Sequence, residues 1–270
     1  MYNWGKGVIG MNQLLQKKAF ICDMDGVIYH GNLLLNGVRE FVDWLERTQK
    51  EYIFLTNSSE RSPRELQQKL KRMGLEIGVE HFYTSALATA SYLKNQCPGG
   101  SAYVIGEAGL VGALYDAGFS MNDVNPDYVV VGETSGYSFE KIVKAVMLVR
   151  NGAKLIGTNP DVTGPIENGI APACRALVSP IEMASGRHAY FIGKPNPLMM
   201  RHAQKRLTSL PEETAIIGDR MDTDIVAGIE SGMDTVLVLS GVTSRETMAK
   251  YAYQPHYVLN GVGDIPKYAQ

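Results

Sequence analysis

Two aspartates stand one residue apart, directly after an apolar run near the start of the chain. Ala19–Cys22 is followed by Asp23 and Asp25, with Gly26 next. This pattern predicts a buried strand that places its last side chains in a crevice, which is where open α/β sheets bind ligands. Two carboxylates in such a place can share a cation. The alternative is an ordinary solvated turn, since Asp and Gly are common turn residues.

A second apolar run, Tyr52–Leu55, also ends in polar groups. Thr56, Asn57 and Ser58 follow it directly. Their hydroxyl and backbone N–H groups can cradle phosphate oxygens where a strand gives way to a helix. The same residue types gather at most helix entrances, and the capping box Ser62–Glu65 lies just beyond. The segment therefore indicates a phosphate site only in combination with others.

A third run, Ala189–Ile192, leads to Lys194, which stands between Gly193 and Pro195. Most lysines are solvated surface residues. A lysine confined between glycine and proline at the end of a strand is less typical. Its compact positive charge would suit a phosphate or a nucleophilic carboxylate.

A fourth run, Thr214–Gly218, ends in Asp219, and Asp222 and Asp224 stand at the start of the next predicted helix. Acids in a first helical turn are often only caps or dipole partners, which is how we interpret Asp222. Asp219, together with the two earlier aspartates, would complete an oxygen-rich site. Such a site suits Mg²⁺, a hard cation usually held by one or two carboxylates, waters and substrate phosphate.

The four segments, in this order, resemble those of the haloacid dehalogenase superfamily of phosphatases. They read Asp-Met-Asp-Gly-Val, Leu-Thr-Asn, Gly-Lys-Pro, and Gly-Asp with a later Thr-Asp. Further phrases make the chain most similar to the NagD-like branch, which includes nucleotide, sugar-phosphate, phosphoglycolate and pyridoxal-phosphate phosphatases. These phrases are Thr84-Ser-Ala, Val104-Ile-Gly-Glu, Asn125-Pro-Asp-Tyr-Val-Val-Val-Gly, Thr158-Asn-Pro-Asp and Gly193-Lys-Pro-Asn-Pro. The resemblance runs from about Lys17 to about Asp264.

The resemblance assigns the chemistry to the first pair of acids. It implies that Asp23 is the nucleophile that accepts the phosphoryl group as an aspartyl phosphate, and that Asp25 is the general acid and base. A phosphoacceptor switch of the response-regulator kind is a non-enzymatic alternative, because it uses a similar acidic pocket, aspartate and lysine. Asp25 favours the enzyme, since a switch needs its aspartyl phosphate to persist. A phosphomutase is the alternative among enzymes.

The resemblance also implies ligands for phosphate and metal. The residues that would hold the phosphoryl group are Thr56, Asn57, Ser58 and Lys194. Those around Mg²⁺ would be Asp23, the main-chain carbonyl of Asp25, and Asp219, with Asp224 orienting a metal-bound water or its neighbours. The implied function is Mg²⁺-dependent hydrolysis of small phosphomonoesters. Nucleoside monophosphates or sugar phosphates are favoured, and phosphoglycolate and pyridoxal phosphate are alternatives.

Strands and helices alternate through the chain, which favours a parallel sheet covered on both faces. An apolar stripe after the first strand has the spacing of an amphipathic helix; it consists of Val38, Phe41, Val42 and Leu45. A second series of elements separates the first two polar segments from the last two. Its expected strands are 102–105, 128–131 and 155–158, and its expected helices are 110–117 and 139–150.

We therefore predict a Rossmann-like, doubly wound parallel-sheet core that is interrupted by an inserted α/β cap domain. The core comprises residues 17–83 and 181–270, the cap 84–180, and an N-terminal arm 1–16. A cap can exclude water and select the substrate. The resemblance implies that its turn-rich loop 159–172 reads the leaving group, with Asp161 as a candidate specificity residue. The loop has no His, Lys, Arg or aromatic side chain, so nothing in it supports a strongly acidic or a stacking leaving group.

The resemblance implies a small phosphorylated metabolite as partner, and composition gives no case for a polymer or a membrane. The net charge of −2 gives no broad electrostatic case for a nucleic-acid polymer or a membrane surface. No stretch approaches the roughly 18 apolar residues of a membrane span. Three widely spaced cysteines, and an opening segment without a signal peptide's apolar core, predict a reduced, cytoplasmic protein. Caps in this superfamily often meet partner chains, which leaves a homo-oligomer open.

The first ten residues carry one pattern that we set aside. Gly5–Gly10 matches a dinucleotide-binding fingerprint by letter, but no strand precedes it, so we predict no nicotinamide site there. Residues 1–10 are expected to be a loose arm or an upstream start.

Overall fold

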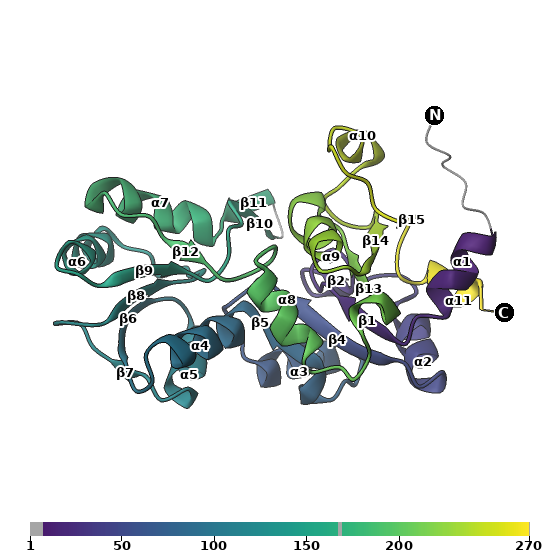
Figure 1. The fold of residues 1–270 in the computed structure, drawn as a ribbon, viewed down its shortest axis with the longest axis horizontal. Coiled ribbons are helices and arrows are strands. Elements are labelled where there is room, and N and C mark those ends of the chain that lie inside the picture. Colours follow the sequence, from purple (N-terminus) through teal and green to yellow (C-terminus); the bar gives the residue numbers. More distant parts are fainter. Residues whose placement is uncertain (1–7, 167–168, 270) are drawn as a thin grey trace. The chain divides into compact units, whose positions relative to one another are not determined.

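The computed structural model describes residues 8–166 and 169–269, which fall into two compact units (Figure 1). The first unit contains the described parts of residues 1–55, 69–81 and 200–270. The second contains those of residues 56–68 and 82–199. In sequence, the second unit therefore interrupts the first.

Parallel strands form the centre of the first unit. In spatial order they are β15 (Tyr257–Leu259), β14 (Asp234–Val238), β13 (Thr214–Gly218), β1 (Ala19–Cys22) and β4 (Glu51–Thr56). Each neighbouring pair is parallel. β1 and β13 are buried along their whole length, as expected of central strands covered on both faces. The predicted parallel-sheet core is thereby confirmed.

Helix α2 (Val38–Arg47) shows how the first unit packs. It buries the predicted stripe together with Trp44. The indole of Trp44 lies edge-on to Phe20 of β1, with ring centroids 5.5 Å apart. Burying one such side chain stabilises a fold by about 1.5–3 kcal/mol, so this interface fixes α2 on the sheet.

The remaining elements of the first unit are short. They are α1 (Val8–Leu15), β2 (Tyr29–His30), β3 (Leu33–Leu34), 3₁₀ turns at Val79–His81 and Pro211–Glu213, a π-helical turn at Met221–Ile225, α9 (Val226–Glu230), α10 (Arg245–Met248) and α11 (Asp264–Lys267). Two helices, α3 (Pro63–Arg72) and α8 (Pro197–Gln204), belong partly to each unit.

The second unit has its own parallel sheet. Its strand order is β12 (Tyr190–Phe191), β9 (Lys154–Gly157), β8 (Tyr128–Val131), β6 (Ser101–Ile105) and β7 (Ser120–Met121). The other elements are β5 (Phe82–Thr84), α4 (Ser85–Gln96), α5 (Ala108–Asp116), α6 (Phe139–Arg150) and α7 (Cys174–Ser185). The predicted strands and helices of this region lie within one or two residues of these bounds, which confirms the second α/β series.

The structure adds detail to two predictions about this region. Residues 159–172, expected as a loop, contain the antiparallel strands β10 (Thr163–Ile166) and β11 (Gly169–Pro172). Both strands include a proline, which is a signal against a strand, so the sequence did not indicate them. Ile181, the expected return point to the core, lies inside α7 and is buried in the second unit's core. The predicted domain bounds stay a prediction.

The N-terminal segment is described in part. Residues 8–15, within the expected arm, form α1, where Met11 and Leu14 are buried. Residues 1–7, with half of the glycine-rich pattern, lie outside the described residues. In the described ranges, no helix has the length and apolar character needed to cross a bilayer.

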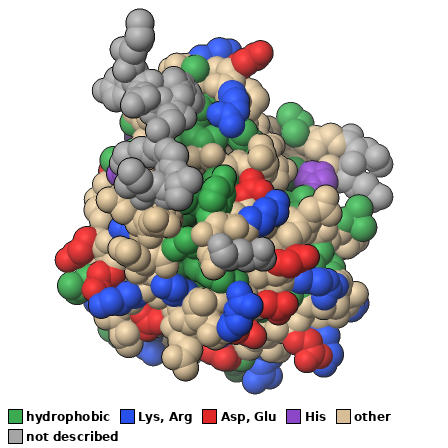
Figure 2. All heavy atoms as spheres, turned by 90° about the vertical axis from the view of Figure 1, so that its right-hand side faces the viewer, with side chains coloured by type: hydrophobic (Ala, Val, Ile, Leu, Met, Phe, Trp, Pro, Cys, Tyr) green, Lys and Arg blue, Asp and Glu red, His purple; other side chains and the backbone are tan. Residues whose placement is uncertain are grey.

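Charged side chains of both signs are interspersed on the face drawn in Figure 2. Blue and red groups alternate over its lower half and do not gather by sign. This distribution accords with the small net charge of −2.

Candidate active site

Three carboxylates meet in the first unit. Asp23, Asp219 and Asp224 each offer an oxygen within 4.8 Å of the others. Asp23 and Asp219 come together because β1 and β13 are parallel neighbours, with Cys22 opposite Ile217, so both acids follow the same edge of the sheet. Like charges at this spacing repel unless a cation or a proton intervenes. The cluster has the donor chemistry of a hard divalent cation.

Two glycines make room for Asp219, which is 2% exposed. A Cβ on Gly241 would lie 2.0 Å from Asp219 Oδ2, and one on Gly26 would lie 2.6 Å from the same atom. Gly26 also has a φ of +79°, which strongly favours glycine. The backbone N–H of Val242 donates to Asp219 Oδ2 at 2.7 Å. The carboxylate is thus held in a slot that admits no side chain at either glycine.

Asp224 comes from the π-helical turn Met221–Ile225 and is completely buried. Its Oδ2 accepts a hydrogen bond from the Arg220 backbone N–H at 3.1 Å. A Cβ on Gly218 would lie 2.1 Å from the Cβ of Asp224, so this close approach also needs glycine. Asp222 instead forms an ion pair with the Arg220 side chain at 3.2 Å, and its own side chain is 51% exposed.

Asp25 lies in the turn that follows β1. The hydroxyl of Tyr29 donates to Asp25 Oδ2 at 3.1 Å. The turn is closed by the Gly26 N–H, which donates to the Tyr29 carbonyl at 2.9 Å. Ser240 supports it from the other side, because its hydroxyl donates to the Gly26 carbonyl at 2.7 Å.

The side-chain amide of Asn57 organises a polar cluster in the second unit. Its Nδ2 donates to Asp161 Oδ2 at 2.9 Å and to the Lys194 carbonyl at 3.0 Å, and the Lys194 N–H donates to Asn57 Oδ1 at 2.7 Å. The Ser58 N–H donates to Thr56 Oγ1 at 3.1 Å. Lys194 is 2% exposed, which is rare for a lysine and requires polar or anionic partners. The structure therefore gathers all five predicted residues of this group.

Glu133, which the sequence analysis did not single out, supports the same cluster. Its Oε2 accepts hydrogen bonds from the N–H and the hydroxyl of Ser59, at 3.2 and 2.6 Å, and its Oε1 accepts one from Asn159 Nδ2. Desolvation raises the pKa of Glu133, with these hydrogen bonds opposing the shift. Glu133 stands two residues after the buried strand β8, and this is the kind of signal that identified Asp23.

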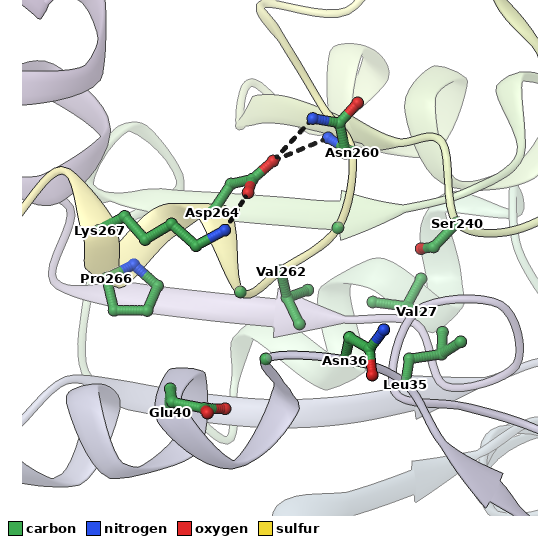
Figure 3. A pocket seen from close by; sticks show the side chains of 13 residues that line it. Val27, Leu35, Asn36, Glu40, Ser240, Asn260, Val262, Asp264, Pro266 and Lys267 are labelled. Carbon is green, nitrogen blue, oxygen red and sulfur yellow. Dashed lines mark hydrogen bonds and ion pairs between the residues drawn. The ribbon is translucent and has the colours of Figure 1, made fainter.

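A separate pocket of about 660 Å³ lies in the first unit (Figure 3). Asp264 is held there by Lys267 Nζ at 2.8 Å and by Asn260 Nδ2 at 3.2 Å. Ser240 forms part of the wall and links the pocket to the turn at Gly26. None of the three clustered acids is among the described residues that line it.

The described chain matches known proteins along most of its length. Residues 20–120 match the haloacid dehalogenase-like hydrolase family, and residues 191–265 match a HAD-hydrolase-like family. The dihydroxyacetone phosphatase of Corynebacterium glutamicum is 45% identical over 92% of this chain and 90% of its own length. Ribonucleotide monophosphatase NagD of Escherichia coli is 41% identical over 92% of this chain and 98% of its own length. The solved structure of E. coli K-12 NagD matches with a TM-score of 0.86 at 40% identity, covering 92% of this chain and 98% of that one.

The parallel sheet, the carboxylates at its edge and the interrupting α/β unit define a Rossmann-like hydrolase with a cap. The chain belongs to the haloacid dehalogenase-like hydrolases, in their NagD-like branch. It is a phosphoric monoester hydrolase, so the predicted family and enzyme class are confirmed and the phosphoacceptor switch is set aside.

Proposed function

We propose that this protein is a Mg²⁺-dependent phosphatase that hydrolyses small phosphomonoesters through an aspartyl phosphate on Asp23. The observation that carries the proposal is the convergence of Asp23, Asp219 and Asp224 within 4.8 Å. A nucleophile needs only one carboxylate. The two further acids are both buried, and together with Asp23 they supply the one or two carboxylate ligands by which Mg²⁺ is usually held.

The chemistry of the acidic cluster fits the metal. We propose that Asp23, the main-chain carbonyl of Asp25, and Asp219 hold Mg²⁺, and that Asp224 orients this shell from behind Gly218. When bound, the ion would offset the negative charge of the carboxylates and of the substrate phosphate. The glycine slot around Asp219 supports this assignment. A buried carboxylate adds little to the stability of the fold, so a binding role explains why it is held there.

The two chemical steps then fall to the chain's own residues. An oxygen of Asp23 attacks phosphorus and forms the aspartyl phosphate, while the ester P–O bond breaks and Asp25 gives its proton to the leaving oxygen. Asp25, now a carboxylate, takes a proton from water as that water attacks phosphorus. The bond to Asp23 breaks, inorganic phosphate leaves, and both acids return to their starting forms.

We propose that the second-unit cluster holds the phosphoryl group. Thr56 ends β4, and β4 pairs with β1 in parallel register, with Phe54 opposite Cys22. Parallel strands present their carboxyl ends at one edge, which supports a shared substrate. The side-chain amide of Asn57 is already hydrogen-bonded to Asp161 and Lys194. We therefore propose that the phosphate oxygens are bound by the backbone N–H groups of Asn57 and Ser58, the Thr56 hydroxyl and the Lys194 ammonium group.

Asp161 and the surrounding cap are proposed to act on the leaving group. The hydrogen bond from Asn57 supports a position for Asp161 near the phosphate-holding segment, where it also orients the Asn57 amide. We propose that the predicted cap, residues 84–180, excludes water and limits the size of the substrate. The names of the relatives, dihydroxyacetone phosphatase and ribonucleotide monophosphatase, support sugar phosphates and nucleoside monophosphates as substrates.

Phosphate release from a panel of esters tests the proposal. The panel comprises nucleoside monophosphates, sugar phosphates, phosphoglycolate and pyridoxal phosphate, each with Mg²⁺ or with chelator. We expect release that chelator abolishes and that Asp23→Asn lowers by at least about 10³-fold, since that variant keeps the shape but loses the nucleophile. Metal-independent release, or full activity of Asp23→Asn, would overturn the proposal.

A further inference from the structure

Tyr29 and Lys69 form a chain of contacts that ends on Asp25. We propose that Tyr29 is a positioning residue that orients the Asp25 carboxyl group for proton transfer, and that Lys69, whose ammonium group lies over the Tyr29 ring, strengthens this action. The inference rests on the proposed acid and base role of Asp25.

The turn after β1 brings Tyr29 to Asp25. The two residues are four apart and also form a backbone bridge, while Gly26 with its φ of +79° turns the chain between them. The Tyr29 side chain is 2% exposed, so its hydroxyl is held by its surroundings and not by solvent. Its hydrogen bond to Asp25 Oδ2 at 3.1 Å therefore restricts rotation of the carboxyl group about its Cβ–Cγ bond.

The direction of that hydrogen bond assigns roles to the two carboxyl oxygens. The phenol donates to Oδ2, so this oxygen anchors the carboxyl group. We infer that the other oxygen, Oδ1, exchanges the proton with the substrate. Loss of the phenol would remove one restraint on the direction of the carboxyl group, and general acid catalysis is sensitive to such geometry.

Lys69 comes from α3, forty residues further along the chain. Its Nζ lies 3.6 Å from the centroid of the Tyr29 ring, and the residue is only 8% exposed. A buried ammonium group over an aromatic face is attracted by the ring's electron density. The cation also withdraws that density and makes the phenol a better hydrogen-bond donor. Lys69 thus both fixes the ring and strengthens its bond to Asp25.

Two substitutions test the two members of the chain. Tyr29→Phe removes the hydroxyl and keeps the ring, whereas Lys69→Met removes the charge and keeps most of the stem. We expect Tyr29→Phe to lower kcat on a sugar phosphate by about 10- to 100-fold with little change in KM, because general acid–base catalysis contributes about 10²–10⁴-fold. We expect Lys69→Met to lower kcat by a smaller factor, and Lys69→Arg to restore it.

A substrate whose leaving group needs no proton distinguishes a role of Tyr29 in proton transfer from a purely structural role. With 4-nitrophenyl phosphate, the first step in Tyr29→Phe should stay fast, while attack by water still depends on Asp25. Rapid mixing should then show a burst of nitrophenolate equal to the enzyme concentration, followed by slow turnover. The matched control is Tyr52→Phe, which removes a tyrosine hydrogen bond to Glu46 in the same unit and should give wild-type kinetics.

The outcomes separate this inference from the proposed function. Loss of activity in Asp23→Asn and Asp25→Asn, with wild-type kcat and no burst in Tyr29→Phe and Lys69→Met, would overturn the inference alone. Full activity of Asp23→Asn would overturn the proposed function itself. If Tyr29→Phe fails to fold, the Lys69→Met and Lys69→Arg pair decides: a kcat that falls in the first and recovers in the second supports the inference, and equal kcat values contradict it.

Discussion

A methyl group added at Gly241 would displace the Asp219 carboxylate. The Cβ of an alanine at position 241 would lie 2.0 Å from Asp219 Oδ2, far inside van der Waals contact, and Asp219 is itself buried. We expect Gly241→Ala to weaken Mg²⁺ binding by about 10- to 100-fold, because it displaces a proposed ligand. Calorimetric titration with Mg²⁺ measures this. Gly112→Ala, where an added Cβ meets nothing within 4 Å, is the control; equal affinities in both variants would contradict the slot.

The raised pKa of Glu133 predicts that the free energy of unfolding depends on pH. Desolvation raises its pKa in the folded protein above the ordinary value of 4.5, so the folded state binds this proton more tightly than the unfolded chain does. Its contribution to the free energy of unfolding is therefore fully present below about pH 4.5 and is lost as the pH rises through the raised pKa. Glu133→Gln cannot titrate.

Denaturant unfolding of both proteins across this range measures the effect. The stability of the wild type relative to Glu133→Gln should fall as the pH rises above about 4.5 and level off once Glu133 is ionised. A difference that stays constant with pH would show that the carboxyl group does not titrate differently on folding.

Residue-level signals in the sequence were strongest where a polar side chain directly follows an apolar strand. Asp23 and Asp219 were identifiable on that ground, and the structure places them together with Asp224. The role of the Asn57 amide was not, because its partners Asp161 and Lys194 are more than a hundred positions away in sequence. A hydrogen bond between such distant residues depends on tertiary structure and leaves no local pattern.

At the scale of elements, the start of α3 has the capping box that its local sequence predicts. Ser62 Oγ accepts from the Glu65 N–H at 3.3 Å, and Glu65 Oε2 accepts from the Ser62 N–H at 2.7 Å, as the predicted capping box requires. We expect Ser62→Ala to lower the free energy of unfolding by about 1 kcal/mol. Urea denaturation checks this against Ser231→Ala, at the end of α9, where no N-cap is lost. Equal stabilities would mean that the box contributes nothing.

Apolar continuity explains which elements the sequence could predict. The strand Tyr128–Val131 and the helix Phe139–Arg150 have the predicted bounds, since each is an unbroken run with the right period. The π-helical turn Met221–Ile225 had no such signal, because it is a five-residue segment with two aspartates and no apolar run. The hairpin β10–β11 was missed because Pro165 and Pro172 argue against strands.

At the scale of the whole molecule, the sequence does not say which sheet a short edge strand joins. The segment Tyr190–Phe191 follows the predicted return to the core, yet it pairs with β9 of the second unit. A two-residue edge strand adds contacts to whichever sheet it joins, and its sequence does not say which. The order of the four polar segments was predictable because each follows its own apolar run, whereas the sheet that a short edge strand joins leaves no such pattern.

Metal binding should appear as a change in the stability of the whole protein. An ion that binds only the folded state stabilises it by RT ln(1 + [L]/Kd), which is about 2.7 kcal/mol at a hundredfold excess over Kd. We therefore expect Mg²⁺ to raise the melting temperature of the wild type. Asp219→Asn should abolish that rise, and without metal it should be more stable than the wild type, because it removes one of three repelling carboxylates.

Asp222→Asn is the matched control for this whole-molecule effect. Asp222 lies three residues from Asp219, but its carboxylate faces the Arg220 side chain and is 51% exposed, so its contribution to stability is small. We expect this variant to keep the full response to Mg²⁺. A response that survives in Asp219→Asn, or one that disappears equally in both variants, would show that the cluster of Asp23, Asp219 and Asp224 is not where the ion binds. Loss in Asp219→Asn alone would tie folding stability to the same carboxylates that are proposed to carry the chemistry.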